Sequence, residues 1–397
     1  MIQIVRSALV VAACLVAGLN VASPALGAEV RVDGDAALRA ALSSAKPGDD
    51  IRVAPGRYAS VSARDLRGEA NQPIVIQAAK VDDPPVFVGP KVGIHLSRCA
   101  HVVLRNLTVR GAENNGINID DGGDAARPSH HVVLERVTVA GVGGQGNRDA
   151  FKLSGVTDFV VRDCTADGWG GSGIDMVGCH RGVVENCTFR NHDDRRQANG
   201  VQMKGGSSAI TVRRCTFVRP GGRGVNVGGS TGLAYFRPVD APHEAKDLTV
   251  EGCRFVGGDA AVSFVGVDGA VVRYNTIYAP RRWAVRILQE NQDRRFVPCR
   301  NGRFEKNVVV FESAVVRQVV NVGGGTRPET FMFAGNVWYA KDNPGRSRSQ
   351  LPVAERAGVY GVDPGLKAPE RDDLTAPRSG ATVDAGADAL PEGAPRK

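Results

Sequence analysis

The segment V-E-N-C-T-F (184–189) recurs as V-R-R-C-T-F (212–217), and the same pattern runs through most of the chain. In each copy apolar residues alternate, skip one position at a bend and alternate again, which indicates a strand, a corner and a second strand. The copies follow one another at intervals of 22–38 residues. They cover residues 104–109, 134–139, 161–166, 184–189, 212–217, 250–255, 272–277, 304–309 and 333–338.

A further repeated strand precedes most copies, for example G-V-Q-M (200–203) and G-V-N-V (224–227). Three short strands per repeat cannot bury an apolar face alone and must stack on their neighbours. The repeats therefore predict an all-β fold, a parallel β-helix with rungs about 4.8 Å apart. One repeat position holds small residues, which we interpret as a buried cysteine stack continued by an amide ladder, with a disulfide framework or metal site as the alternative. These residues are Cys164, Cys187, Cys215, Cys253, Asn275, Asn307 and Asn336.

The two ends of the chain differ from the repeats. Residues 1–27 have a basic start, an apolar run and a small-x-small cleavage site, which predicts a signal peptide and a secreted or periplasmic protein. A lipoprotein signal around Cys14 is the alternative. Residues 30–58 predict a strand, a capping helix and a second strand ahead of rungs over 70–341. We expect a single β-helix domain over 28–341 and an irregular tail over 342–397.

The chain of 397 residues carries a formal charge of +8, with 50 basic and 42 acidic residues. A basic exported protein attracts anions through its long-range field. No nucleic-acid-binding motif and no further membrane-spanning segment is found, so an acidic polysaccharide is the expected partner of a monomeric protein.

On the further repeated strand, to which G-V-Q-M (200–203) belongs, one outward position is polar in rung after rung. Adjacent rungs bring such side chains within about 5 Å of each other, so Asp175 is expected to hold Lys152 and Lys204 in place. We interpret this row as a sugar-binding groove, with a merely solvated polar face as the alternative. The row comprises Asn118, Lys152, Asp175, Gln202, Asn226, Ser263 and Arg286, and the next outward position holds Asp120, Ser154, Val177, Lys204 and Gly228.

Long insertions follow some of these strands, at 120–131, 192–197 and 228–247. Long loops in a regular solenoid gather on the binding face. Aromatic and basic side chains there can stack on sugar rings or pair with carboxylates in fork geometry. The candidates are Arg223, Tyr235, Arg237, His243 and Arg286.

Such a face suits the cleavage of a uronate polymer by β-elimination. That reaction needs a neutralised C6 carboxylate, a base for the C5 proton and a proton for the leaving oxygen. A bound Ca²⁺ or a cluster of Arg, Asn and Gln can neutralise the carboxylate, and a lysine can take the C5 proton. Asp120, Asp149 and Asp175 offer oxygen ligands for Ca²⁺, and Lys152 and Lys204 are the candidate bases.

The cap with P-G-D-D-I-R-V-A-P-G-R-Y (47–58) and then G-E-A-N-Q-P-I-V-I-Q-A (68–78) resembles exported proteins of the pectate-lyase-like superfamily. The closing segments V-D-P-G-L-K-A-P (362–369) and G-A-T-V-D-A-G-A (380–387) resemble those of many bacterial members. The resemblance implies a right-handed parallel β-helix. It leaves the substrate open, because one fold hosts many functions.

N-R-D-A-F-K-L (147–153) and N-G-V-Q-M-K-G-G (199–206) resemble two segments of the family-9 pectate lyases, one donating Ca²⁺ ligands and one carrying the catalytic lysine. The resemblance implies that Asp149 and Asp175 are metal ligands. The family's lysine aligns with Gln202, and Lys204 follows two residues later on the same face. Alginate and glycosaminoglycan lyases of this fold pair a lysine with an arginine, which implies Lys204 with Arg223.

These features predict an exported lyase that cleaves an acidic polysaccharide, with Ca²⁺ as the candidate cofactor. Three alternatives stay open on the same fold: a non-catalytic carbohydrate-binding protein, a glycoside hydrolase and a uronate C5-epimerase. N-H-D-D (191–194) faintly resembles the Asp-Pro-His-Asp motif of alginate epimerases.

Overall fold

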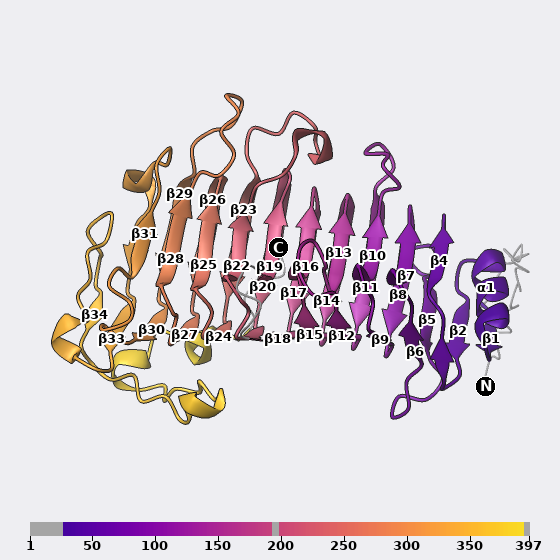
Figure 1. Cartoon of the computed structure of the whole chain (residues 1–397), viewed down its shortest axis with the longest axis horizontal. Helices are drawn as coiled ribbons and strands as arrows, with labels where there is room; N and C mark the ends of the chain where they lie inside the picture. Colours follow the sequence, from indigo (N-terminus) through magenta and orange to yellow (C-terminus); the bar gives the residue numbers. More distant parts are fainter. Residues whose placement is uncertain (1–26, 193–197, 393–397) are drawn as a thin grey trace, which may run out of the picture.

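The computed structural model describes residues 27–192 and 198–392, in which the strands form three long parallel sheets (Figure 1). The expected signal peptide and most of the 192–197 insertion lie outside the described residues. Sheet A holds β1 (Glu29–Val32), β2 (Asp50–Val53), β5 (Ile74–Ala78), β8 (Ala100–Arg105), β11 (Ser129–Glu135), β14 (Val156–Arg162), β17 (His180–Glu185), β20 (Ser207–Arg213), β23 (Ala245–Glu251), β26 (Val267–Arg273), β29 (Arg300–Glu305) and β32 (Met332–Ala334).

The other two sheets complete each rung. Sheet C holds β4 (Val61–Arg64), β7 (Val92–Ser97), β10 (Asn115–Asp120), β13 (Phe151–Ser154), β16 (Ser172–Val177), β19 (Asn199–Lys204), β22 (Arg223–Gly228), β25 (Ala260–Val265), β28 (Trp283–Leu288) and β31 (Val320–Val322). Sheet B holds β3 (Arg57–Tyr58), β6 (Val86–Val88), β9 (Thr108–Arg110), β12 (Thr138–Val142), β15 (Thr165–Trp169), β18 (Thr188–Arg190), β21 (Thr216–Val218), β24 (Arg254–Val256), β27 (Thr276–Tyr278), β30 (Val308–Phe311), β33 (Val337–Ala340) and β34 (Val359–Tyr360).

The repeated segment has the predicted strand, corner and strand. In V-E-N-C-T-F the strand β17 ends at Glu185 and β18 begins at Thr188. Between them Asn186 has a φ of 55°, and Arg214 has 51° at the same corner one rung later. A residue in this left-handed conformation turns the chain sharply, which explains why the apolar alternation skips one position there.

The core consists of side chains that stack from rung to rung. The rings of Phe189, Phe217 and Phe255 are nearly parallel, with centroids 4.9 and 4.8 Å apart, which is the spacing between paired strands. All seven cysteines among the described residues are free and buried, including the four of the predicted stack. The amide ladder is also confirmed, because Asn275 donates to Asn307 at 2.9 Å and Asn307 donates to Asn336 at 3.0 Å.

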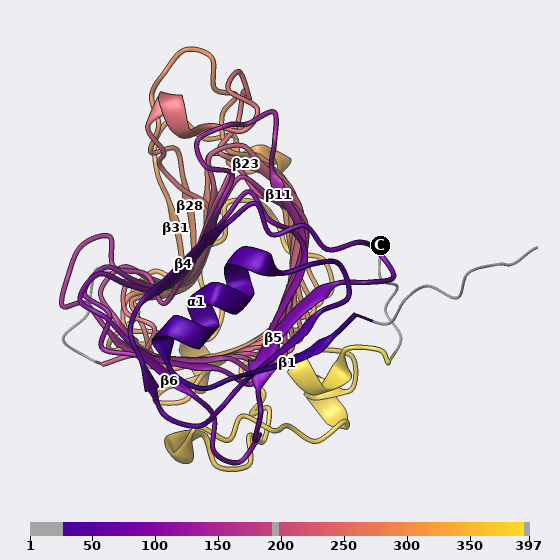
Figure 2. The same cartoon turned by 90° about the vertical axis from the view of Figure 1, so that its right-hand side faces the viewer.

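The helix α1 (Asp35–Ser44) lies across the N-terminal end of the solenoid (Figure 2). Its buried face, Leu38, Ala41 and Leu42, packs onto the first rung. At the other end, the segment after β34 turns back beneath sheet B (Figure 1), where Leu374 and Ala385 join an apolar cluster on its outer side. That segment contains η4 (Pro369–Arg371), η5 (Gly380–Thr382) and η6 (Ala387–Ala389), whereas η3 (Pro344–Arg346) lies between β33 and β34.

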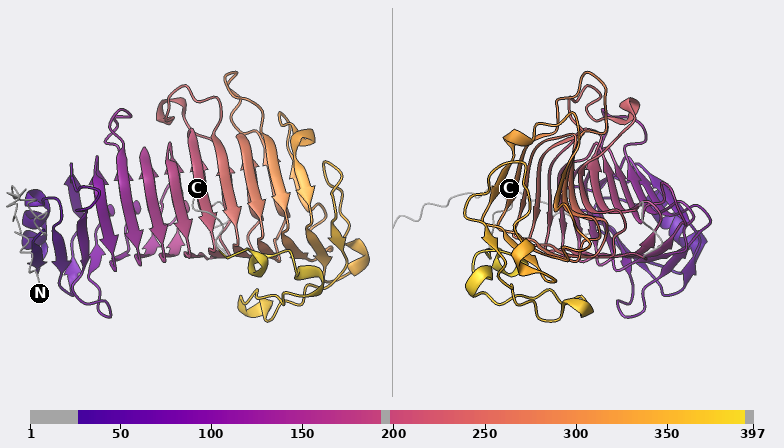
Figure 3. Two further views of the ribbon diagram at one scale, coloured as in Figure 1. Left: turned by 180° about the vertical axis from the view of Figure 1, so that it is seen from behind. Right: turned by 60° about the vertical axis from the view of Figure 1, so that its left-hand side comes forward.

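Loops that connect sheet C to sheet A protrude from one edge of the solenoid, after β10, β22, β28 and β31 (Figures 1 and 3). The loop after β22 contains η1 (Leu233–Tyr235), and the one after β31 contains η2 (Pro328–Thr330). Parallel strands present the same end to the same edge, so insertions at equivalent corners gather there. In the described part of the chain no helix has the length and apolar character needed to cross a membrane.

Candidate functional site

The predicted polar row is present on the outer side of sheet C. Lys152 pairs in register with Asp175, Asp175 with Gln202, and Gln202 with Asn226. The row extends beyond the predicted residues to Ser62 and His95 at one end and Asn321 at the other.

The second row differs from the prediction in one place. Val177 lies opposite Lys204 as expected, but the register shifts after Gln202, so that Gly228 lies opposite Met203 instead of Lys204. Gly228 has a φ of 101°, a conformation that other residues rarely adopt, and this distortion starts the long loop after β22.

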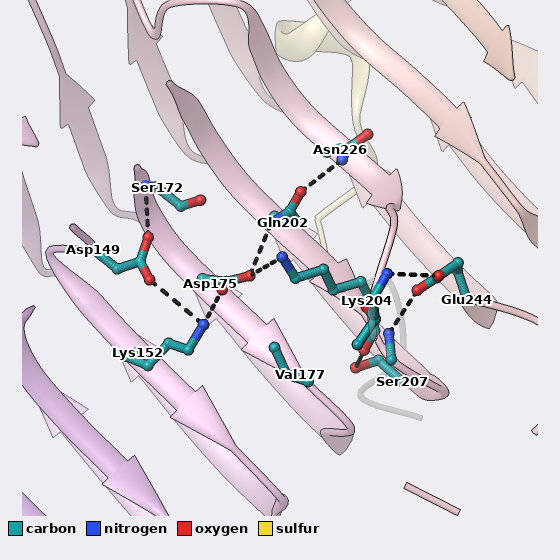
Figure 4. Close-up of polar contacts among 12 residues, drawn as sticks. Asp149, Lys152, Ser172, Asp175, Val177, Gln202, Lys204, Ser207, Asn226 and Glu244 are labelled. Carbon is teal, nitrogen blue, oxygen red and sulfur yellow. Dashed lines mark hydrogen bonds and ion pairs between the residues drawn. The ribbon is translucent and has the colours of Figure 1, made fainter. Parts of the chain in front are cut away.

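A continuous polar network joins four rungs of sheet C (Figure 4). The Lys152 ammonium makes ion pairs with Asp175 and with Asp149, the latter at 3.5 Å. Lys204 Nζ lies 3.6 Å from the other oxygen of Asp175. That oxygen also accepts a hydrogen bond of 2.9 Å from Gln202 Nε2, and Gln202 Oε1 accepts one of 2.8 Å from Asn226.

The charges in this network depend on one another. Burial alone would raise the pKa of Asp175, but the ammonium groups of Lys152 and Lys204 lower it. Burial alone would likewise lower the pKa of Lys152, but Asp175 and Asp149 raise it. Burial and the charge of Asp175 raise the pKa of Asp149 to about 7. Asp175 is therefore the fixed anion and Lys152 its fixed cation.

The network is covered rather than open to solvent. Asp175, Asn226 and Ser263 have no exposed surface, and Gln202 is 8% exposed. Asn226 Oδ1 and Ser263 Oγ are buried without a hydrogen-bond partner among the described residues. Only the ends of the lysines reach outward, with 14% of the Lys152 side chain and 17% of the Lys204 side chain exposed.

Both lysines line a cavity of about 400 Å³ at the C-terminal ends of β13, β16 and β19. Arg237 and the exposed ring of Tyr235 close it from the loop after β22. The described residues that line this cavity include three cationic side chains and no carboxylate. The lining consists of Asn147, Lys152, Ser154, Gly155, Val177, Lys204, Ser230, Thr231, Gly232, Tyr235 and Arg237.

A buried carboxylate fixes the loop over this cavity. Glu244 has no exposed surface and accepts hydrogen bonds from the backbone N–H groups of Gly205 and Thr231, at 3.0 and 2.9 Å. The Asn291 amide donates a third, at 3.2 Å. Glu244 thus ties the turn after Lys204 to the loop, and Arg237 is held separately by Asp121 at 2.8 Å.

A second cavity, of about 270 Å³, lies near the opposite ends of β19, β22 and β28. There the guanidinium carbons of Arg282 and Arg286 lie 4.1 and 4.2 Å from the ring centroid of Trp283. Arg223 also lines this cavity and pairs with Glu290. Arg223 lies opposite Asn199, five residues before Lys204, so the expected lysine–arginine pair is not formed.

The three aspartates expected to bind Ca²⁺ do not converge. The Lys152 ammonium already contacts Asp149 and Asp175 together. Asp120 belongs to another cluster, where it accepts hydrogen bonds from Ser97 at 2.7 Å and Asn118 at 2.8 Å and contacts His95 Nε2 at 2.7 Å. Ca²⁺ takes six to eight oxygen ligands, and these residues do not fit it.

The remaining predicted residues are dispersed. Asn118 belongs to the Asp120 cluster, two rungs from Asp175. Arg286 lies in the second cavity, whereas His243 is 8% exposed and lines neither cavity. The sequence-based selection missed Glu244 and the Trp283 cluster, although the run Arg281-Arg282-Trp283 beside Arg286 is a visible signal for the latter.

A model of the right-handed β-helix region matches residues 92–237. No curated protein sequence matches the chain significantly. The chain has the right-handed β-helix fold. An alginate lyase from Paenibacillus sp. strain FPU-7 is 18% identical with a TM-score of 0.51, over 75% of this chain and 96% of the other.

Another similar β-helix is the A-module of the mannuronan C-5 epimerase AlgE6 of Azotobacter vinelandii. It is 16% identical with a TM-score of 0.52, over 83% of this chain and 96% of the other. These likenesses confirm the right-handed parallel β-helix fold expected from the sequence. At such identities they establish the fold alone.

Proposed function

We propose that this β-helix is an exported lyase that cleaves a uronate-containing polysaccharide by β-elimination. The observation that supports this proposal most directly is the cavity at the end of β19, where Lys152, Lys204 and Arg237 gather without a carboxylate in the lining. Such a site attracts an anionic sugar. Lys204 in its lining can also transfer a proton, and a site that only binds a sugar does not need such a group.

The reaction requires three groups around the sugar. A cation must neutralise the C6 carboxylate, so that the C5 proton becomes acidic. A base then takes this proton, the C5–H electron pair forms the C4=C5 double bond, and the C4–O bond breaks. The leaving oxygen finally receives a proton from an acid, so that the products are a new non-reducing end carrying the double bond and a free hydroxyl.

We assign the base role to Lys204 rather than Lys152. The Lys152 ammonium lies between two carboxylates that raise its pKa, so it keeps its proton and serves as a permanent positive charge. Among the described residues Lys204 makes an ion pair only with Asp175, at 3.6 Å, and its side chain lines the same cavity. Lys152 and Arg237 would bind the carboxylate, and the Tyr235 hydroxyl would protonate the leaving oxygen.

The second cavity extends the proposed binding groove. It lies at the other end of β19, about 17 Å from Lys204 at 3.3 Å per residue. Arg282 and Arg286, held on Trp283, suit a further uronate carboxylate because a guanidinium binds it through two hydrogen bonds. The polymer would then run across sheet C between the two cavities.

The decisive experiment offers the purified protein a panel of pectate, alginate, hyaluronan, heparan sulfate and chondroitin, with Ca²⁺ and with a chelator. We expect ultraviolet absorbance from the new C4=C5 bond on at least one polymer, in both conditions. New reducing ends without absorbance would indicate hydrolysis, and inverted C5 centres by NMR without cleavage would indicate epimerisation. Binding with no chemical change would refute the lyase proposal in favour of a binding protein.

The site is tested with single variants. Lys204→Ala should abolish turnover while circular dichroism shows that the chain is still folded. Lys246→Ala is the matched control, because Lys246 is exposed on sheet A, away from both cavities. Full turnover in Lys204→Ala would disprove the base assignment. Export is tested separately by sequencing the N-terminus of the mature protein, which we expect to begin at Ala28.

A further inference from the structure

Three of the seven histidines of the chain gather on sheet A, outside both cavities. His101 is on β8, and His130 and His131 are on β11, one rung later. His130 lies opposite Ala100 and Val132 opposite Val102, so His131 takes the position of His101 in the next rung. The rings of these two residues consequently stack, with centroids 4.4 Å apart and planes 22° apart.

The third ring completes a cluster of imidazole nitrogens. His130 stands nearly perpendicular to both other rings, at 89° to His101 and 85° to His131. Its Nδ1 lies 2.9 Å from His131 Nδ1. One nitrogen from each of the three residues lies within 4.8 Å of the other two.

We propose that His101, His130 and His131 form a site for a divalent transition-metal ion of the zinc type. Zinc binds imidazole nitrogen at about 2.0–2.1 Å, so tetrahedral coordination places two ligating nitrogens about 3.4 Å apart. His130 Nδ1 and His131 Nδ1 are 2.9 Å apart, and the ligand atoms of the three residues all lie within 4.8 Å of one another. Because the lone pair of an imidazole lies in the ring plane, His101 or His131 must rotate out of the stack to direct its nitrogen at a shared ion. Imidazole ligands favour Zn²⁺, Cu²⁺ and Ni²⁺ over Ca²⁺ or Mg²⁺.

The surroundings suit a three-histidine site with an open fourth position. His131 is exposed, and His101 and His130 are half-buried, so an ion can enter from solvent. The next residue in the column, Asp158, is held by two hydrogen bonds from Arg181, of 2.7 and 2.8 Å. Its carboxylate is therefore engaged, and the fourth ligand would be water or a group from solution.

A bound ion would link β8 to β11 at the base of the loop after β10. The two strands already pair through the backbone, and the ion would add side-chain bonds between consecutive rungs. Because a ligand that binds only the folded state stabilises it, metal binding should raise the melting temperature. This site is independent of the proposed lyase chemistry and can be tested whether or not the protein cleaves a polysaccharide.

The test uses the full-length protein, stripped of metal with a chelator and then titrated with Zn²⁺ by calorimetry. We expect one ion per chain and a higher melting temperature with Zn²⁺. His101→Asn and His131→Asn are suitable variants, since both residues have a φ near 50° and asparagine tolerates that conformation. Each should weaken binding by at least about 10- to 100-fold, while His192→Asn, at an exposed histidine elsewhere, should not.

Two outcomes would overturn the proposal. One is the absence of saturable Zn²⁺ binding in a chain whose circular dichroism shows that it is folded. The other is unchanged affinity in both His101→Asn and His131→Asn. In either case the cluster would be only a hydrogen-bonded pair, His130 with His131, packed against a third ring.

Discussion

Asp149 makes the stability of the β-helix depend on pH in a way that one substitution can isolate. Its side chain is buried, and its Oδ1 accepts a hydrogen bond of 2.8 Å from the backbone of Ser172. Its Oδ2 lies 3.5 Å from the Lys152 ammonium and has no closer hydrogen-bond partner among the described residues. Burial and the nearby charge of Asp175 raise its pKa from 3.8 to about 7. We predict that Asp149→Asn removes a loss of stability that the wild type undergoes as the pH rises towards 7.

The sign follows from counting protons. Below pH 3.8 both the folded and the unfolded chain hold the Asp149 proton, and above pH 7 neither does. Between these values only the folded chain holds it, so the free energy of unfolding falls as the pH rises. At about 1.36 kcal/mol per pH unit, the wild type loses about 2 kcal/mol between about pH 5.5 and about pH 7 through this residue.

Guanidinium denaturation at a series of pH values measures the effect. Histidines also titrate in this range, so the informative quantity is the difference between wild type and Asp149→Asn. That difference should change by about 2 kcal/mol between about pH 5.5 and about pH 7 and level off about one pH unit higher. Asp82→Asn, at an exposed loop residue, should run parallel to the wild type. If the free energy of unfolding of Asp149→Asn also changes with pH as that of the wild type does, the buried aspartate is ionised throughout this range and the reasoning is wrong.

Three further predictions concern buried polar groups. Asp175→Ala should lower the free energy of unfolding by about 3–5 kcal/mol, because it leaves Lys204 without its carboxylate partner and Lys152 with Asp149 alone; a change below about 1 kcal/mol in guanidinium denaturation would contradict this. Glu244→Ala leaves three donors without their acceptor, at about 1–3 kcal/mol each. Limited proteolysis in the loop after β22 should therefore become faster, and an unchanged cleavage rate would count against the contact. Asn307→Ala interrupts the amide ladder, and its melting temperature should fall even though the residue is remote from both cavities; an equal melting temperature would mean that the ladder contributes little.

The fold was predictable because its determinants are local and repeated. The skipped position in V-E-N-C-T-F marks a left-handed corner, and one such corner predicts the others. The cap helix, the cysteine stack and the amide ladder follow from the same periodicity. The register shift at Gly228 was not predictable in this way, because it interrupts the repeat and depends on how the following loop is held.

The site was predictable as a row of residues but not as a set of roles. Strand alternation places Lys152, Asp175 and Lys204 on one face, and the register does the same in the structure. It cannot reveal that Lys152 lies between two carboxylates, since Asp149 precedes the strand. The resemblance to alginate and glycosaminoglycan lyases implied a pair of Lys204 with Arg223, although the two residues occupy opposite ends of adjacent strands.

The geometry of a parallel solenoid explains why chemistry concentrates at one edge of sheet C. Every strand of this sheet ends at the same edge. A residue inserted between a strand of sheet C and the following strand of sheet A therefore lies on the edge that holds the cavity of Lys152 and Lys204, whichever rung it comes from. The loop after β10 reaches the site in this way, because its Asp121 holds Arg237 of the loop after β22, 116 residues later. Loops can therefore vary in length without disturbing the stacked core. The polar row of sheet C beneath them cannot vary in this way, because its strands pair in register with their neighbours. In the proposed lyase, substrate selection should accordingly depend on the loop residue Arg237, whereas the base Lys204 is positioned by Asp175 within the sheet.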